Sequence, residues 1–329
     1  MNNMPWQLSQ RVLILGSFAA IYFIWGSTYL FNYFAIQDIP PFLMSGSRFL
    51  TAGAVLYAIT WLWGAPHPTP RQWLMATYIG FLFLSVGTGG TVWAEQYVDT
   101  GITALLVSLQ PLMIVLMMWG LQGKRPSGQV VFGVALGILG MSFLVGQQRF
   151  VNDYNTIIGM LVIGLSLTSW SYGAVIVGKA NLPVNRLQSA AMQMLGGGGI
   201  LLLLALASGD FLRFSFAALS LKAGLSWVIL VVFGSLVAFS AFTYLLQNVS
   251  PDKVATSNYV NPVVAMFLGW AFNQELINAQ SIIAACLMLA GVFLMNSRLQ
   301  IKKKPPSAGL GQNHSRALRL RWLSPRPKI

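Results

Sequence analysis

The sequence predicts an all-α integral membrane protein with ten transmembrane helices, arranged as two inverted five-helix repeats around a central cavity. Three observations lead to this prediction. Apolar residues make up 56% of the 329 positions and charged residues only 8%, whereas a soluble domain carries roughly 25% charged residues. Apolar runs of about 20 residues, the length that crosses the hydrocarbon core, follow one another with short connections. The chain also repeats its own pattern in its second half.

The ten predicted spans are apolar runs separated by Pro, Gly and charged residues. The first five cover residues 12–35, 42–63, 73–93, 100–121 and 130–146. The second five cover residues 157–177, 187–207, 223–246, 254–272 and 281–296. Pro111 and Pro262 lie inside the fourth and ninth spans. A membrane helix tolerates proline where neighbouring helices satisfy the carbonyl that loses its donor.

The net charge of +13 comes mostly from the last segment of the chain, because nine of the twenty Lys and Arg residues lie from Arg298 onward. We therefore expect residues 298–329 to be a disordered basic tail that meets anionic lipid, and we expect no nucleic-acid partner. Positive residues also gather in alternate connections, where they mark the cytoplasmic side. These are Arg11, Arg71, Lys124, Arg125, Lys179, Arg186 and Lys253. The pattern predicts a multi-pass protein of the inner (plasma) membrane with both termini cytoplasmic.

An internal repeat appears when the chain is shifted by 151 residues, which aligns 98–145 with 249–296. Pro111 then falls on Pro262 and Trp119 on Trp270, and a slightly different offset puts Trp25 on Trp170. Five spans are an odd number, so the second half must enter the membrane from the opposite side. Inverted repeats are typical of secondary transporters. The alternative is a duplicated helical bundle with no transport activity.

The stretch 258–270 (NYVNPVVAMFLGW), followed by Glu275, resembles the second EamA domain of the drug/metabolite transporter superfamily. Trp25-Gly26, Pro40-Pro41 and Arg48 resemble the first. The likeness covers repeats at 12–146 and 157–297 and is strongest to YedA-like bacterial exporters. It implies ten helices around a central cavity and export of amino acids, related metabolites or drug-like compounds. Lys124 departs from the pattern, because the family often has Glu there.

Arg48 is the clearest candidate site residue, because it lies about two turns inside the second span, where a charge is costly. It either pairs structurally with Glu95, Asp99 or Asp38, or it holds a substrate carboxylate through a bidentate contact. Glu95, near the end of the third span, is the candidate proton site.

Two further groups are candidate substrate-binding residues. The first surrounds the two prolines, which free backbone carbonyls for binding, and comprises Gln110, Asn258, Tyr259 and Asn261. The second is aromatic and suits stacking or cation–π contacts; it comprises Trp25, Tyr29, Trp93, Trp170, Tyr172 and Tyr244. Helix–helix hydrogen bonding and interfacial anchoring are the respective alternatives.

The function classes that remain are all forms of transport. The sequence has no ATP-binding Gly-Lys-Ser/Thr motif, and its two histidines, His67 and His314, lie in a connection and the tail. We therefore expect no enzyme activity, no metal and no cofactor, and we expect a monomer that exports a small amino acid or a related zwitterionic or aromatic compound. A multidrug or organic-cation exporter is the alternative. A nucleotide-sugar or phosphate-ester exchanger fits less well, because such substrates need several intramembrane cations.

Overall fold

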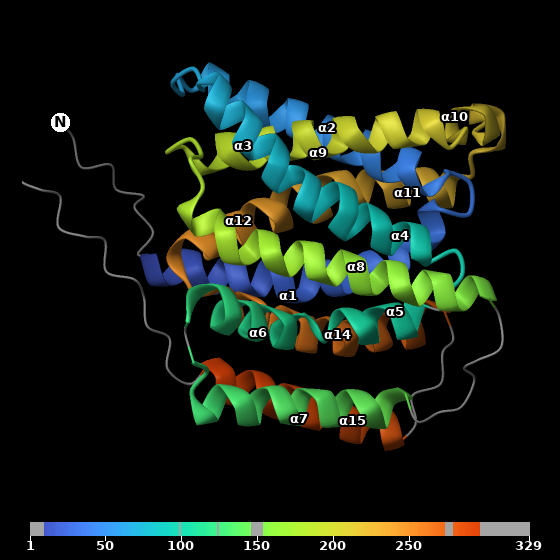
Figure 1. Ribbon diagram of the computed structural model, residues 1–329. Coiled ribbons are helices and arrows are strands. Elements are labelled where there is room, and N and C mark those ends of the chain that lie inside the picture. Colours follow the sequence, from blue (N-terminus) through green and yellow to red (C-terminus); the bar gives the residue numbers. More distant parts are fainter. Residues whose placement is uncertain (1–9, 99, 124, 146–153, 274–278, 297–329) are drawn as a thin grey trace, which may run out of the picture. The chain divides into compact units, whose positions relative to one another are not determined.

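The computed structural model describes residues 10–98, 100–123, 125–145, 154–273 and 279–296 (Figure 1). Helices fill nearly all of these ranges, and no strand occurs within them. The predicted tail at 298–329 lies outside the described residues, as do Asp99, Lys124 and Glu275. The all-helical prediction is therefore confirmed for the described part of the chain.

The helices of the first half are α1 (Gln10–Ala35), α2 (Pro41–Leu62), α3 (Pro70–Gly80), the π-helical segment η1 (Phe81–Gly89), α4 (Gly90–Ala94), α5 (Thr100–Val107), α6 (Gln110–Gln122) and α7 (Gly128–Val145). Those of the second half are α8 (Tyr154–Ile176), η2 (Val177–Lys179), α9 (Arg186–Ala207), α10 (Asp210–Arg213), η3 (Phe216–Ala218), α11 (Leu221–Ile229), the π-helical segment η4 (Leu230–Phe239), α12 (Ser240–Asn248), α13 (Pro251–Val254), α14 (Ser257–Asn273) and α15 (Ala279–Asn296).

Helical segments lie over all ten predicted spans, and six continuous helices are long and apolar enough to cross a membrane. They are Gln10–Ala35, Pro41–Leu62, Pro70–Ala94, Tyr154–Lys179, Arg186–Ala207 and Leu221–Asn248. Shorter apolar helices cover Met113–Gln122, Gly128–Gly140 and Val260–Phe272. The length and composition of these six helices support a multi-pass membrane protein, while the count of ten spans stays a prediction.

Two predicted spans are interrupted, because each consists of two helices separated by a two-residue turn. The fourth is broken at 108–109, and α6 restarts with Pro111 in its first turn. A proline is suited to that place, because the first N–H groups of a helix have no partner within it. The ninth is broken at 255–256, and α14 then runs through Pro262. The two related prolines therefore sit in different local structures.

Polar caps in the connections explain where several helices begin. Thr69 and Gln72 form a reciprocal capping box at the start of α3. Asn185 accepts hydrogen bonds from the backbone of Leu187 and Gln188 at the start of α9. Each cap satisfies N–H groups that the first turn of a helix leaves without partners.

Glycines let pairs of helices approach closely. Between α2 and α9, a Cβ at Gly53 would lie 3.0 Å from Leu195, and one at Gly198 would lie 2.9 Å from the Leu50 nitrogen. Between α7 and α15, a Cβ at Gly291 would lie 2.6 Å from the Gly133 carbonyl. Small residues serve helix packing in this way in membranes. In Figure 1 the α7–α15 pair lies at one edge of the bundle, with α2 and α9 toward the other.

Candidate functional site

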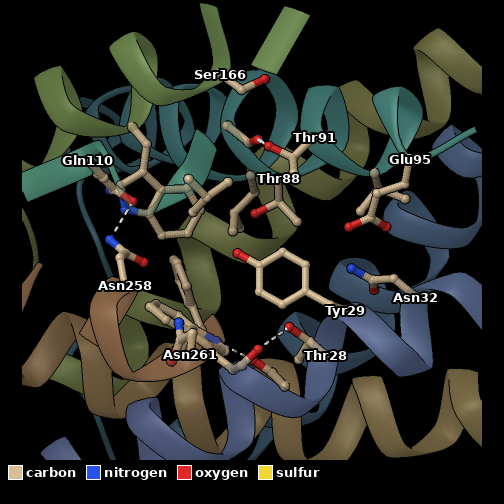
Figure 2. Close-up of a pocket in the computed structure, with 18 of the residues that line it drawn as sticks. Thr28, Tyr29, Asn32, Thr88, Thr91, Glu95, Gln110, Ser166, Asn258 and Asn261 are labelled. Carbon is tan, nitrogen blue, oxygen red and sulfur yellow. Dashed lines mark hydrogen bonds between the residues drawn. The ribbon is translucent and has the colours of Figure 1, made fainter. Parts of the chain in front are cut away.

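A cavity lies among α1, α2, η1, α4, α5, α6, α8, η4 and α14 (Figure 2). Its empty space is about 760 Å³, including the part that opens to solvent. Helical spacing brings its polar lining together, because residues three or four apart share a helix face. On α1 the lining residues are Trp25, Thr28, Tyr29 and Asn32. On η1 and α4 they include Leu84, Thr88, Thr91 and, directly after the helix, Glu95.

Arg48 is buried and lines this cavity. Its Nε donates to Ser235 Oγ at 2.8 Å, and its Nη1 donates to Asn32 Oδ1 at 3.3 Å. Among the described residues no carboxylate forms an ion pair with it. Asp38, one of the pairing partners considered from the sequence, instead accepts from the Ser220 backbone nitrogen at 2.9 Å. Hydrogen bonding from the Ser220 side chain and from its backbone, outside the spans, lowers the pKa of Asp38. Two neutral groups therefore hold a guanidinium that keeps unused donors beside the cavity.

Glu95 also lines the cavity and is 7% exposed. Neither of its carboxylate oxygens has a hydrogen-bond partner among the described residues. Figure 2 shows the Asn32 amide directed toward this carboxylate, while the Asn32 oxygen accepts from Arg48. The two charged groups of the cavity thus lie on either side of one amide.

A cluster of amides lies where α6 and α14 face the cavity. Asn258 Nδ2 donates to Gln110 Oε1 at 2.8 Å and joins the two helices. The Asn261 amide faces the backbone carbonyls of Ser257, Tyr22 and Ile21 at 2.9, 3.1 and 3.2 Å, so we orient it with its nitrogen donating to them.

Pro262 adds a backbone feature to this cluster. Because a proline inside a helix cannot donate to the carbonyl four residues earlier, Pro262 leaves the carbonyl of Asn258, a residue that lines the cavity, without that bond. Pro111 lies in the first turn of α6, where no such bond is expected.

Aromatic rings form another part of the lining. Trp25 and Trp170, related by the repeat, meet edge to face with centroids 5.7 Å apart. Each also contacts a glycine in a π-helical segment of the other half. Trp25 Nε1 donates to the Gly234 carbonyl at 3.3 Å, and a Cβ at Gly87 would lie 2.7 Å from Trp170. π-helical turns inside α-helices are frequent at functional sites.

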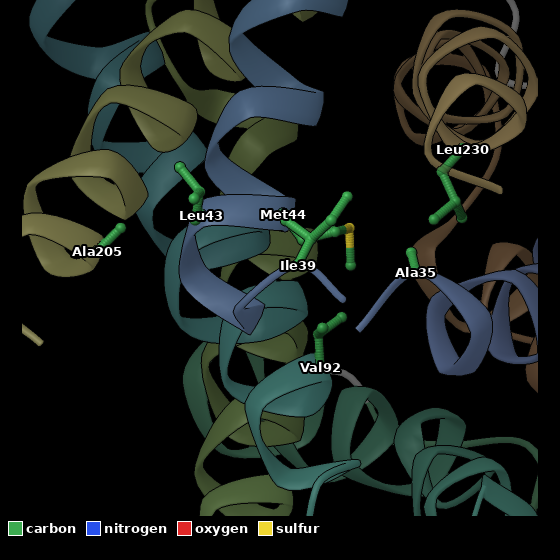
Figure 3. Close-up of a cluster of buried hydrophobic side chains, with 7 residues drawn as sticks. All are labelled: Ala35, Ile39, Leu43, Met44, Val92, Ala205 and Leu230. Carbon is green, nitrogen blue, oxygen red and sulfur yellow. The ribbon is translucent and has the colours of Figure 1, made fainter. Parts of the chain in front are cut away.

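One boundary of the cavity is an apolar cluster (Figure 3). Its buried members come from the end of α1, the loop after it, α2, α4, α9 and η4: Ala35, Ile39, Leu43, Met44, Val92, Ala205 and Leu230. Val92 belongs to both the cluster and the cavity lining. Hydrogen bonds from the Phe42 nitrogen to Asp210 and from Trp227 to Ser47 lie in the same region. Packing therefore holds the α1–α2 connection firmly against the second half.

The predicted substrate-binding residues divide into two sets. Those that line the cavity are Trp25, Tyr29, Arg48, Gln110, Trp170, Asn258 and Asn261, together with Glu95. Trp93 instead stacks near Tyr97, with ring centroids 5.0 Å apart. Tyr244 lies under the Arg186 guanidinium at 4.8 Å, and Tyr172 lies beside Tyr78. The Tyr259 side chain lies outside the described residues.

Several lining residues escaped the sequence analysis, notably Asn32, Thr88 and Thr91. A helical period was the signal that could have found them. Asn32 follows Trp25 by seven residues on α1, and Thr91 and Thr88 precede Glu95 by four and seven. Each therefore shares a face with a residue that was singled out.

Comparison with known proteins gives a consistent result. The EamA-like transporter family matches residues 12–146 and 157–297. The inner membrane transporter YedA of Escherichia coli K12, described as uncharacterized, is 33% identical over 290 residues, which cover 87% of this chain and 91% of that protein. The transporter YoaV of Bacillus subtilis, also described as uncharacterized, is 23% identical, covering 86% and 96%. A crystal structure with 22% identity has a TM-score of 0.69 and covers 88% of this chain and 98% of its own.

Apolar helices around a buried polar cavity, together with these relatives, define the class: the protein is a multi-pass membrane transporter. The chain belongs to the EamA-like transporter family, within the drug/metabolite transporter superfamily, and carries two copies of the family's domain.

Proposed function

We propose that the protein exports a small zwitterionic metabolite, an amino acid or a related aromatic compound, from the cytoplasm by alternating access. It acts as a monomer in the inner membrane, with ten spans in two inverted repeats and both termini cytoplasmic. The observation that carries the substrate class is Arg48, a buried guanidinium that lines the cavity and has no ion-pair partner among the described residues. A substrate carboxylate is the partner that its fork of donors fits best.

The rest of the lining supports a substrate with an apolar or aromatic body. Trp25, Trp170, Phe49 and Phe239 lie on the cavity wall beside the amides of Gln110 and Asn258. Aromatic walls with a few polar groups are typical of small-molecule sites. Arg48 is the only Lys or Arg among the described lining residues, which disfavours multiply charged phosphate esters. Glu95 supports the alternative, an organic-cation exporter.

The first test is counterflow of amino acids in proteoliposomes that contain the parent, Arg48→Ala, Arg48→Lys or the control Arg71→Ala. Arg71 is an exposed residue at the start of α3. We expect Arg48→Ala to raise the KM for the transported amino acid at least about ten-fold, which corresponds to roughly 1.4 kcal/mol of lost binding energy. Arg48→Lys should restore little, because an ammonium lacks the planar fork.

An Arg48→Ala variant that moves amino acids as well as Arg71→Ala would return Arg48 to a structural role. Flux of organic cations in the absence of any amino-acid flux would favour the alternative exporter.

A further inference from the structure

The Glu95 carboxylate is the group in the cavity that the proposed carboxylate recognition by Arg48 does not use. It is buried at 7% exposure, it lines the cavity, and both of its oxygens are without a hydrogen-bond partner among the described residues. Burying a carboxylate without partners is costly. Among the described residues the Asn32 amide is the donor that lies beside these oxygens, so they keep the capacity to accept a further donor or a cation.

Arg48 does not supply that partner, because Asn32 lies between the two charges. Arg48 Nη1 donates to Asn32 Oδ1 at 3.3 Å, which fixes which end of the amide faces the guanidinium. Ser235 holds the Nε of the same guanidinium at 2.8 Å. In Figure 2 the Asn32 amide nitrogen points toward Glu95. Asn32 thus keeps a cation and an anion in one cavity without letting them form a direct pair.

The surroundings of Glu95 leave room for a ligand group. Thr91 lies one turn from Glu95 on the same helix face, while Figure 2 shows the hydroxyls of Tyr29 and Thr88 directed toward the middle of the cavity, away from Glu95. The two oxygens of a carboxylate can accept N–H bonds from a primary ammonium, which offers three donors. A ligand with an ammonium and a carboxylate would then meet Glu95 at one end and Arg48 at the other.

We propose that Glu95 is the ammonium-binding residue of the cavity and that Asn32 is the positioning residue that keeps it available. This inference rests on the proposed function for the other half of the ligand, the carboxylate at Arg48. The two are separable, because the ammonium and the carboxylate can be removed from a probe one at a time.

The test measures binding of three probes to the purified protein by isothermal titration calorimetry: phenylalanine, N-acetylphenylalanine without the ammonium, and phenethylamine without the carboxylate. For the parent we expect phenylalanine to bind at least about ten-fold more tightly than N-acetylphenylalanine. Glu95→Gln, which keeps size and shape, should reduce that ratio to within about two-fold. Asp38→Asn, a carboxylate change outside the cavity, should leave the ratio unchanged.

Asn32 is tested by rescue. In Asn32→Leu the two charges are free to pair directly, so N-acetylphenylalanine should bind more weakly than to the parent because Arg48 is occupied. Adding Glu95→Gln to Asn32→Leu should restore N-acetylphenylalanine binding. A merely structural loss would not be repaired by a second substitution, so a double variant as weak as Asn32→Leu overturns the positioning role.

Other outcomes separate this inference from the proposed function. If phenylalanine and N-acetylphenylalanine bind the parent equally well, the ammonium site is wrong while carboxylate recognition stands. If phenethylamine binds through Glu95 and phenylalanine does not bind, the ammonium site stands and the amino-acid function is wrong. Binding of none of the three probes overturns both.

Discussion

At the scale of single residues, Gly234 lies where two functional side chains converge. Its carbonyl accepts from Trp25 Nε1, and a Cβ placed on it would lie 2.6 Å from Arg48 Nη2. A side chain of any size would thus compete with the guanidinium for the same space. Gly234 contributes to the site through the volume it leaves empty.

Gly234→Ala should therefore weaken substrate binding without abolishing folding. The added methyl must displace Arg48, and overpacking of this kind costs about 1–3 kcal/mol, which is roughly a ten-fold loss of affinity. Amino-acid binding to the purified protein measures the effect. Gly164→Ala on α8 is the matched control, because a Cβ there meets nothing within 4 Å. Equal affinities of the two variants would contradict the crowding of Arg48.

Among the residues that line the cavity, the sequence identified the charged ones and the amides near the prolines more successfully than the other polar side chains. Arg48 was singled out because a charge is costly in lipid, and Gln110 because it precedes a proline that frees a backbone carbonyl; both line the cavity. Asn32 was missed because it is one amide in a long apolar helix, and only its seven-residue spacing from Trp25 indicates that it shares a face with a candidate residue. Trp93 was a candidate that does not belong to the described cavity lining. Its ring instead packs against that of Tyr97, a contact that nothing in the local sequence indicates.

At the scale of helices, the π-helical segment η1 is connected to α8 by serine hydroxyls. Ser166 Oγ donates to the Val86 carbonyl at 2.8 Å, and Ser169 Oγ donates to the Leu82 carbonyl at 2.9 Å. On the α9 side, Ser85 Oγ donates to the Gly197 carbonyl at 2.8 Å. The segment that carries Gly87 and Thr88 to the cavity is thus held from two sides.

Ser169→Ala should lower the stability of this junction. The variant removes one buried hydrogen bond between helices, which is worth about 1 kcal/mol within a membrane. Its thermal unfolding midpoint in detergent should fall below that of Thr168→Ala. Thr168 is exposed and bonds only within its own helix, to the Gly164 carbonyl. A Ser169→Ala midpoint equal to that of the control would mean that this bond adds nothing measurable.

Helix positions followed well from hydropathy, whereas interruptions within helices did not. Apolar runs determine where a chain can cross lipid, and the helices found at these places agree with the predicted ranges to within a few residues. The break before Pro111 and the continuous helix through Pro262 depend on which neighbours accept or replace each backbone bond. Those neighbours are distant in sequence, so a local sequence pattern cannot predict where the helix is interrupted.

At the scale of the whole molecule, segments that the charge pattern assigns to one side of the membrane meet in the structure. Asp38, after α1, accepts from Ser220, before α11, and the charge pattern puts both connections outside. On the opposite side, Gln188 at the start of α9 donates to the Pro66 carbonyl at 3.0 Å. These contacts agree with the predicted division of the connections between two sides of the membrane, and they hold equally for either orientation.

Labelling of single cysteines can test the orientation and the ten-span count together. In a Cys286→Ser background, a membrane-impermeant maleimide added to intact cells should label Phe216→Cys but not Val184→Cys, at positions that are 83% and 98% exposed. Arg125→Cys lies between α6 and α7 and should also be protected, because the fourth span, which ends with α6, returns the chain to the cytoplasm if it crosses the membrane. Labelling of Arg125→Cys from outside would contradict the fourth and fifth spans.

The contact between Trp25 and Trp170 gives the protein a built-in optical signal. Their rings lie 5.7 Å apart at 83°, close enough for the excited states of two indoles to interact, and one comes from each half of the chain. Any movement of one half against the other that separates the rings should change their shared circular-dichroism band. The transport cycle should therefore be observable in unlabelled protein, with Trp170→Phe as the variant that removes the signal.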